Sequence, residues 1–364
     1  MALREVFQGK TVVVTGHTGF KGSWLSLWMH SLGANVHGYA LRPPSEPSHF
    51  VELGGNELVS STIADITDKE RLRNFVVDLE PDFIFHLAAQ PIVSRSHVNP
   101  VMTWQTNLMG TVHLLEALRE LKGRCNAVFI TSDKAYDNVE WVWGYRENDP
   151  LGGPDPYSAS KGAAEIAIRS YFRSYFEAPD CKIRLASARA GNVIGGGDWA
   201  EARIVPDCMR AWAVKEKVTL RNPHSTRPWQ HVLEPLSGYV ALAMDLALSN
   251  RLTGEAFNFG PATQHSCTVE ELVQRMSVHW DKVRWNSIEA PSQFYESKLL
   301  QLNSDKAAFF LNWEATLGLE DTIQMTVDWY RRYYETSANA RSISHEQIEK
   351  FCAAAREKGL EWSA

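Results

Sequence analysis

Short apolar segments alternate with longer segments of helical spacing through the first half of the chain. The apolar segments predict strands at 11–16, 35–41, 57–65, 81–89, 126–132 and 181–189. Between them, the spacing of apolar residues predicts helices at 22–33, 67–80, 101–121 and 158–176. Such an alternation is typical of a parallel sheet with right-handed crossovers and helices on both faces. Residues 1–189 are therefore expected to form a doubly wound α/β domain.

The sequence changes in character after Ala190. Gly, Pro, Trp and Arg are frequent in 191–207 and 221–235, and regular periods become fewer. This composition indicates ligand-facing loops, so we expect 190–340 to form mainly a smaller, mixed α/β substrate domain, with segments near 230–260 returning to the first domain. The last segment, 341–364, reads as one amphipathic helix to which the sequence assigns no role.

The composition excludes several classes of protein. A net charge of −6 over 364 residues lacks the basic excess of a nucleic-acid-binding protein. The N-terminus carries charges where a signal peptide would be apolar, and no apolar run is long enough to span a membrane, so we expect a cytoplasmic protein with no membrane partner. The cysteines are odd in number and show no C-x-x-C spacing, so we expect neither a disulfide framework nor a metal site. They are Cys125, Cys181, Cys208, Cys267 and Cys352.

A glycine-rich loop, "GHTGFKG", joins the first predicted strand to the first predicted helix. Gly16 permits a tight turn, Gly19 lets the backbone approach a pyrophosphate, and Gly22 allows close packing of helix on strand. Phosphates then lie at the helix N-terminus, where free N–H groups and the helix dipole favour negative charge. The spacing is G-x-x-G-x-x-G, and its place in a strand–loop–helix unit predicts a dinucleotide site on a Rossmann-type sheet.

Residues inside and after the glycine loop complete the predicted dinucleotide site. His17 and Lys21 can add positive charge beside the phosphates, although an ordinary loop histidine and a solvated lysine are the alternatives. Arg42 stands where a ribose-binding carboxylate is usual, so the choice between NAD and NADP stays open. Asp65 is placed to meet the adenine amino group. The full predicted set is Gly16, His17, Gly19, Phe20, Lys21, Gly22, Arg42, Asp65, Ile66, Leu87, Ala88, Ala89, Tyr157 and Lys161.

Tyr157 and Lys161 lie four residues apart in "YSASK" and so share one face of a helix. A tyrosine is a poor base at neutral pH, because its pKa is ordinarily about 10. A neighbouring ammonium and a cofactor cation favour the phenolate, which can then take a proton from a substrate alcohol while a hydride leaves the same carbon. Lys161 can also hold the hydroxyls of the nicotinamide ribose. This pair predicts a dehydrogenase-type site.

These residues make the chain similar to the extended short-chain dehydrogenase/reductase superfamily. Within it, the chain resembles the nucleotide-sugar 4,6-dehydratases, and among these the enzymes that act on CDP-glucose. The resemblance runs from about residue 5 to about residue 335 and leaves the last predicted helix outside it. The stretches that carry it are "GHTGFKGSWL", "TSDKAY", "RAGNVIGGGDW", "RIVPD" and "RPWQHVLEPL".

The resemblance implies three steps on one sugar: oxidation at C4, loss of water across C5 and C6, and return of the hydride to C6. Ser132 would hydrogen-bond the C4 oxygen, and Asp133 would protonate the leaving C6 hydroxyl, which requires a raised pKa. Many dehydratases of this superfamily carry Thr-Asp-Glu here, with the glutamate as base for the C5 proton. In this chain Lys134 takes that place, as in the CDP-glucose enzymes; a salt bridge between Lys134 and Asp133 is the alternative.

The resemblance also implies a set of substrate contacts. Asn192, Arg203 and Arg227 would contact the nucleotide diphosphate, and Asp198 and Trp199 would help to wall the pyrimidine. A surface role for Arg227 stays open. Rival readings are a 4-epimerase or reductase, which shares Tyr157 and Lys161, and a non-catalytic sensor of dinucleotides. The helices 101–121 and 158–176 resemble the pair that builds a dimer interface in this superfamily, so a homodimer or homotetramer is expected.

Overall fold

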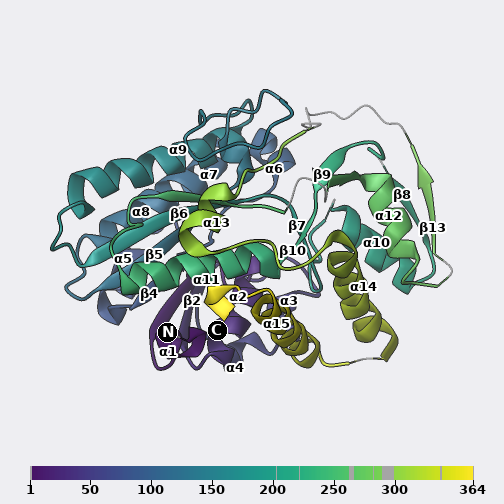
Figure 1. Ribbon diagram of the computed structural model, residues 1–364, viewed down its shortest axis with the longest axis horizontal. Coiled ribbons are helices and arrows are strands. Elements are labelled where there is room, and N and C mark those ends of the chain that lie inside the picture. Colours follow the sequence, from purple (N-terminus) through teal and green to yellow (C-terminus); the bar gives the residue numbers. More distant parts are fainter. Residues whose placement is uncertain are drawn as a thin grey trace.

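The computed structural model describes residues 2–201, 203–220, 222–261, 266–281, 283–288, 299–336 and 338–363. A seven-stranded parallel sheet runs through it in the order β11-β6-β5-β4-β1-β2-β3 (Figure 1). Its strands are β1 (Thr11–Thr15), β2 (Asn35–Ala40), β3 (Ser60–Ile63), β4 (Phe83–His86), β5 (Cys125–Ile130), β6 (Ile183–Ala190) and β11 (Ala256–Phe259). The six predicted strands and the α/β fold class are confirmed, and β11 extends the sheet beyond β6.

The sheet is buried on both faces, because alternate residues of its strands point to opposite sides. In β1, Val12 and Val14 belong to one apolar cluster, whereas Val13 belongs to another. The first cluster lies against α2 (Phe20–Ser31) and α11 (Leu233–Leu248), and the second against α5 (Lys69–Leu79), α8 (Gly110–Leu118) and α9 (Pro156–Tyr171) (Figure 1). Such a sheet needs near-continuous apolar strands, which is how β1, β4 and β5 read.

Local signals fix the starts of the helices. Asp68 caps α5, because its carboxylate accepts a hydrogen bond from the N–H of Arg71 at 3.1 Å. Asp155 caps α9 in the same way, accepting from the N–H of Ser158 at 3.0 Å, and Pro156 occupies the first helical position, where a missing N–H costs nothing. The helix that carries Tyr157 therefore begins at a defined point.

The predicted helix 101–121 is not a continuous α-helix. It consists of α7 (Pro100–Trp104), a π-helical turn η1 (Gln105–Met109) and α8. Inside this turn the buried amide of Asn107 accepts from the N–H of Gln90 at 2.8 Å and donates to the hydroxyl of Ser160 at 2.9 Å. Apolar periodicity does not reveal such a turn, since one extra residue leaves the flanking faces apolar. A second π-helical turn, η3 (Phe172–Phe176), extends α9.

A smaller, mixed α/β part lies to the right in Figure 1 and is built mostly from residues beyond β6. Its strands pair in twos: β7 (Val193–Ile194) with β10 (Gln230–His231), β8 (Lys217–Leu220) with β13 (Arg284–Ser287), and β9 (Thr226–Pro228) with β12 (Ser266–Thr268). Its helices are α10 (Ile204–Ala213), α12 (Val269–Ser277) and α14 (Leu319–Thr336). The limits 1–189 and 190–340 stay a prediction; α11 and β11 lie with the large sheet.

The remaining elements are short or terminal. They are α1 (Leu3–Phe7), α3 (His49–Glu52), α4 (Gly55–Leu58), α6 (Val93–Val98), the 3₁₀ turn η2 (Asp133–Ala135), α13 (Asp305–Leu311), α15 (Ala340–Glu357) and the 3₁₀ turn η5 (Glu361–Ser363). Across the described part of the chain, each helix is too short or too polar to cross a membrane. All five cysteines have free thiols, and only Cys181 is partly exposed.

The C-terminal helix α15 packs against α2 (Figure 1). Phe351 lies edge-on to Trp28, with ring centroids 6.1 Å apart. The hydroxyl of Ser344 lies 3.0 Å from Nε2 of His49, and Nδ1 of the same imidazole lies 2.8 Å from the hydroxyl of Ser23 in the first turn of α2. The helix is thus tied to the start of α2 through one buried histidine.

Candidate active site

Four strands of the large sheet end around one region. Gly16 follows β1, Leu87 follows β4, Thr131 follows β5 and Gly191 follows β6. The sheet order reverses between β1 and β4, because β1 leads to β2 on one side and β4 leads to β5 on the other. Ligands of doubly wound proteins bind at such a reversal, outside the carboxyl ends of the strands.

The glycine loop has the geometry that its sequence predicts. Gly16 has a φ of +76°, and a Cβ there would lie 2.9 Å from the backbone N of Ala88. A Cβ at Gly22 would lie only 2.2 Å from the carbonyl oxygen of Gly16, so α2 packs tightly on the turn. Gly19 differs, because the nearest atom to its Cβ position is 3.3 Å away, and it directly precedes α2. The loop thus fits a pyrophosphate over Gly19; its binding role stays a prediction.

His17 does not add positive charge to this loop. Its Nε2 lies 2.7 Å from the hydroxyl of Ser61, and its ring fills the space in front of Gly38, where a Cβ would be 2.4 Å from the imidazole. Burial lowers the pKa of His17 to about 4, so the ring is neutral at pH 7. This environment favours the ordinary loop histidine over a cationic His17; contact of His17 with a cofactor stays a prediction.

The ammonium group of Lys21 points toward α11 and not into the solvent. Its Nζ lies 3.5 Å from the hydroxyl of Tyr239 in α11. Burial lowers the pKa of Lys21 to about 8, with Asp133 acting in the opposite direction and Arg203 and Lys161 lowering it further. Lys21 therefore faces the polar groups at the end of β5. Tyr239 escaped the sequence analysis because it sits in an almost entirely apolar helix.

The other predicted cofactor residues lie around this loop. Leu87, Ala88 and Ala89 follow β4, and the N–H of Ala88 donates to the hydroxyl of Thr15 at 3.1 Å. Arg42 and Asp65 follow β2 and β3 and are exposed.

Phe20 and Ile66 are engaged in packing. A Cβ at Gly195 would lie 3.4 Å from the ring of Phe20, and one at Gly110 would lie 2.8 Å from the side chain of Ile66. Both side chains therefore support neighbouring backbone, and their contact with a cofactor stays a prediction.

The end of β5 brings Ser132, Asp133 and Lys134 into one turn. The hydroxyl of Ser132 donates to Asp133 at 2.9 Å and accepts from the backbone N–H of Lys134 at 3.2 Å. Burial raises the pKa of Asp133, while the Lys134 ammonium and the Ser132 hydroxyl pull it down. A Cβ at Gly191 would lie 3.0 Å from Oδ2 of Asp133, so a glycine leaves room for this carboxyl. The raised pKa required of an acid is present.

Tyr157 and Lys161 are brought to the same place by α9. They are 7% and 6% exposed. Burial raises the pKa of Tyr157 to about 12, and the nearby Ser132 hydroxyl only partly opposes this effect. Burial lowers the pKa of Lys161 to about 8, opposed by Glu165. The expected lowering of the tyrosine pKa is therefore not produced by the protein groups, because desolvation dominates; a cationic cofactor is the group that would favour the phenolate.

Of the predicted substrate residues, Arg203 and Asp198 form a pair near Tyr157. Nη1 of Arg203 donates to Oδ2 of Asp198 at 2.8 Å. This carboxylate raises the pKa of the guanidinium, and Tyr157 raises it further. Asn192 is exposed just beyond β6. Arg227 lies in β9, and its Nη1 donates to the carbonyl of Thr226 at 2.9 Å.

Trp199 is placed differently from the other predicted substrate residues. It is only 3% exposed, and its indole N–H donates to the hydroxyl of Tyr334 at 2.8 Å. Its ring is edge-on to Trp329, with centroids 5.7 Å apart. This packing favours a structural role within an aromatic cluster over a wall of the base pocket.

Comparisons with known proteins agree with this geometry. The model of the GDP-mannose 4,6 dehydratase family matches residues 13–326. A CDP-glucose 4,6-dehydratase of Salmonella typhimurium is 47% identical over 334 residues, covering 91% of this chain and 93% of the relative. A CDP-paratose 2-epimerase of Salmonella typhi is 24% identical, covering 87% and 98%.

Solved structures share the fold. Pal from Bacillus thuringiensis has a TM-score of 0.75 at 24% identity, covering 88% of this chain and 99% of its own. The dTDP-glucose 4,6-dehydratase of Bacillus anthracis, in complex with NAD, has a TM-score of 0.72 at 21% identity, covering 90% and 98%. The glycine loop, the strand-end turn and the Tyr157–Lys161 pair thus occur in a chain whose sequence matches one family model over most of its length: the protein belongs to the GDP-mannose 4,6-dehydratase family.

Proposed function

We propose that the protein is a cytoplasmic, NAD-dependent dehydratase that converts CDP-D-glucose to CDP-4-keto-6-deoxy-D-glucose. The observation that carries the proposal is the Ser132–Asp133–Lys134 turn beside Tyr157, in a chain 47% identical to a CDP-glucose 4,6-dehydratase. A buried carboxyl with a raised pKa next to the tyrosine suits loss of water. Oxidation at C4 alone would have no use for it.

In the first step, Tyr157 takes the proton of the C4 hydroxyl and Ser132 holds the same oxygen. The Ser132 hydroxyl lies close enough to Tyr157 to lower its pKa, which supports their acting on the same oxygen. NAD, when bound, would supply the acceptor for the C4 hydride and the source of the hydride returned to C6, and its positive charge would favour the tyrosine phenolate. Lys161 holds the ribose hydroxyls and contributes a second positive charge from the same helix face. The glycine loop and α2 supply N–H groups for the pyrophosphate.

In the second step, the C4 ketone acidifies the C5 proton. Lys134 removes that proton, and Asp133 donates its own proton to the C6 hydroxyl as water leaves. The two residues adjoin in one turn, which suits an acid and a base that act on neighbouring carbons of the sugar. Arg203 holds the diphosphate, and its pairing with Asp198 fixes the direction of its guanidinium.

Mass spectrometry of the sugar nucleotide after incubation tests this proposal. CDP-glucose, UDP-glucose and dTDP-glucose are each incubated with the protein and NAD. Loss of 18 Da from CDP-glucose alone is the expected result, since that is the mass of one water. An unchanged mass with an inverted C4 would make the protein a 4-epimerase, and no reaction of a dinucleotide-bound protein would favour a sensor.

We further infer that the protein assembles as a homodimer or homotetramer through α7, η1 and α9. These elements expose apolar side chains that a monomer has no reason to present to water. Val101 is 67% exposed, Met109 42% and Ile166 51%. Helices α7 and α9 and the turn η1 pack against one another, so the three residues lie on adjoining elements. A second copy of the same face would cover them.

A further inference from the structure

A buried ion pair lies directly behind the Ser132–Asp133–Lys134 turn. Glu165 of α9 and Arg189 of β6 are each 3% exposed. The guanidinium donates to the carboxylate from Nε and Nη2, at 3.0 Å each, in a two-pronged arrangement. A buried ion pair adds little net stability over apolar side chains of equal volume, but it fixes direction closely. Its role here therefore lies in the neighbouring residues that it holds in place.

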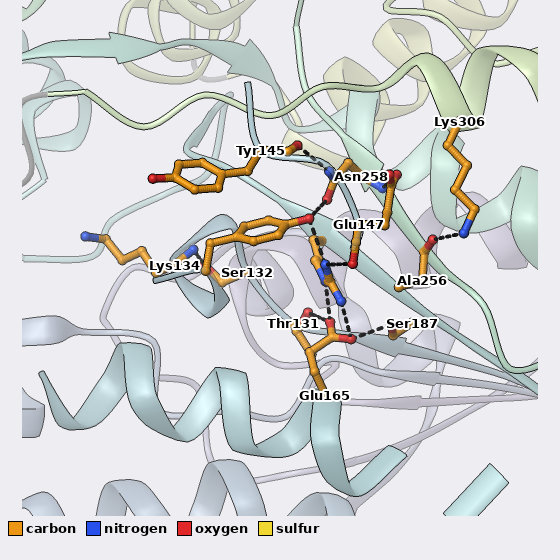
Figure 2. Close-up of polar contacts among 12 residues, drawn as sticks. Thr131, Ser132, Lys134, Tyr145, Glu147, Glu165, Ser187, Ala256, Asn258 and Lys306 are labelled. Carbon is orange, nitrogen blue, oxygen red and sulfur yellow. Dashed lines mark hydrogen bonds and ion pairs between the residues drawn. The ribbon is translucent and has the colours of Figure 1, made fainter. Parts of the chain in front are cut away.

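The pair grips the chain on both sides of the turn. On one side, the hydroxyl of Thr131, which precedes Ser132, donates to the Glu165 carboxylate. On the other side, Nη1 of Arg189 donates to the hydroxyl of Tyr136, two residues beyond Lys134, at 2.7 Å. Figure 2 shows Thr131 and Glu165 together below Ser132 and Lys134. Residues 132–135 lie between these anchors, and Asp133–Ala135 among them form a short 3₁₀ turn whose two ends are thereby fixed.

The same pair also fixes the helix that carries the tyrosine. Glu165 lies one helical turn beyond Lys161 and two beyond Tyr157, on the same face. Its carboxylate opposes the effect of burial on the pKa of Lys161. Because α9, β5 and β6 meet at one carboxylate, a displacement of Glu165 moves the helix and the turn relative to each other.

A third anchor lies in β11. The hydroxyl of Tyr136 donates to Oδ1 of Asn258 at 2.8 Å. Nδ2 of Asn258 in turn donates to the carbonyl of Tyr145 at 2.8 Å (Figure 2). The rings of Tyr136 and Tyr145 are stacked, with centroids 5.0 Å apart. Tyr136 is thus held by its ring and by its hydroxyl.

We propose that Glu165, Arg189 and Tyr136 are positioning residues that set the spacing between the Ser132–Asp133–Lys134 turn and Tyr157. This inference rests on the proposed function, because the spacing matters only if both groups act on one sugar. The expected loss of rate is large, because a displacement of about 1 Å in a reacting group can lower the rate about 10²-fold.

Arg189→Lys tests the proposal. The lysine keeps the positive charge beside Glu165 but loses the fork that bonds Glu165 and Tyr136 at once. We expect kcat to fall about 10²-fold while KM and the content of bound NAD stay unchanged. Tyr136→Phe keeps the stacked ring and removes only the hydroxyl, so it carries the test if Arg189→Lys does not fold; we expect kcat to fall about 10-fold.

Ser187→Ala is the matched control. Ser187 donates to the same carboxylate at 2.7 Å, but it lies opposite Phe129 within the sheet, away from the turn. It should lower thermal stability as much as Tyr136→Phe does and leave kcat at the wild-type value. Wild-type kcat in Tyr136→Phe and Arg189→Lys, or an equal fall in Ser187→Ala, would overturn the positioning role. Failure of the wild-type protein to dehydrate CDP-glucose would instead overturn the proposed function.

Discussion

Gly22→Ala and Gly19→Ala separate two uses of glycine in one loop. At position 22 a Cβ would lie 2.2 Å from the carbonyl oxygen of Gly16 and 2.8 Å from Cα of His17. Both are backbone atoms, so α2 must move by about 1 Å before a normal contact distance is restored. Overpacking of this kind costs about 1–3 kcal/mol in the free energy of unfolding. At position 19 the nearest atom is 3.3 Å away and φ is −79°, so an alanine fits the fold.

The two variants should therefore fail in different assays. Urea unfolding should show Gly22→Ala destabilised by about 1–3 kcal/mol, and Gly19→Ala by less than about 1 kcal/mol. Isothermal titration with NAD should show Gly19→Ala binding at least about 10-fold more weakly, because the methyl group occupies the approach of the pyrophosphate. Gly19→Asp should abolish binding, since repulsion at 4 Å is about 4 kcal/mol. Equal stability of the two alanine variants, or wild-type affinity in Gly19→Ala, would refute this account.

Four further predictions follow from the site and its surroundings. Tyr157→Phe should lose dehydration while the affinity for CDP measured by titration stays unchanged, and retained turnover would move the base elsewhere. Lys134→Met should stall after oxidation; single-turnover absorbance should show reduced nicotinamide, with no solvent deuterium at C5 and a loss of about 10²–10⁴ in rate, whereas normal product release would leave Lys134 as a charge partner only. Ile166→Glu should shift the mass measured by light scattering to that of a monomer, and an unchanged mass would exclude the α9 face. Burial raises the pKa of Glu234 from 4.5 to about 7, so its contribution to stability is present below pH 4.5 and is lost as the pH rises to about 7. In urea unfolding at each pH, the wild type should lose about 3 kcal/mol relative to Glu234→Gln over that window, and parallel curves would contradict the shift.

The pattern of apolar residues was enough to predict the sheet, because strands buried on both faces have to be apolar along their whole length. The glycine loop was predictable for a similar reason: a φ of +76° at Gly16 and the contact at Gly22 admit no side chain. The directions of longer side chains could not be predicted. Lys21 turns toward Tyr239 and the end of β5, and His17 turns toward Ser61, because the packing of distant elements decides each rotamer.

The ionisation of the site also lay beyond the sequence. The raised pKa of Asp133 was predictable, since a carboxyl at the end of a buried strand is desolvated. The raised pKa of Tyr157 was not, because the balance between burial and a neighbouring charge depends on depth. The roles of Glu165 and Arg189 could not be predicted either. Each reads as an ordinary charged residue in the sequence, and only the fold brings the guanidinium of Arg189 to the carboxylate of Glu165.

The C-terminal helix α15 is packed into the folded protein although it lies outside the part of the chain that the family model matches. The family match ends at residue 326, yet α15 lies beyond it and covers the outer side of α2. A chain shortened before Asn339 would leave the ring of Trp28 without Phe351, and His49 without Ser344. Because His49 also bonds Ser23 at the start of α2, the loss would reach the helix whose N-terminus is predicted to face the phosphates. The smallest piece of this protein that can be expected to hold its cofactor is thus larger than the piece that the family model matches.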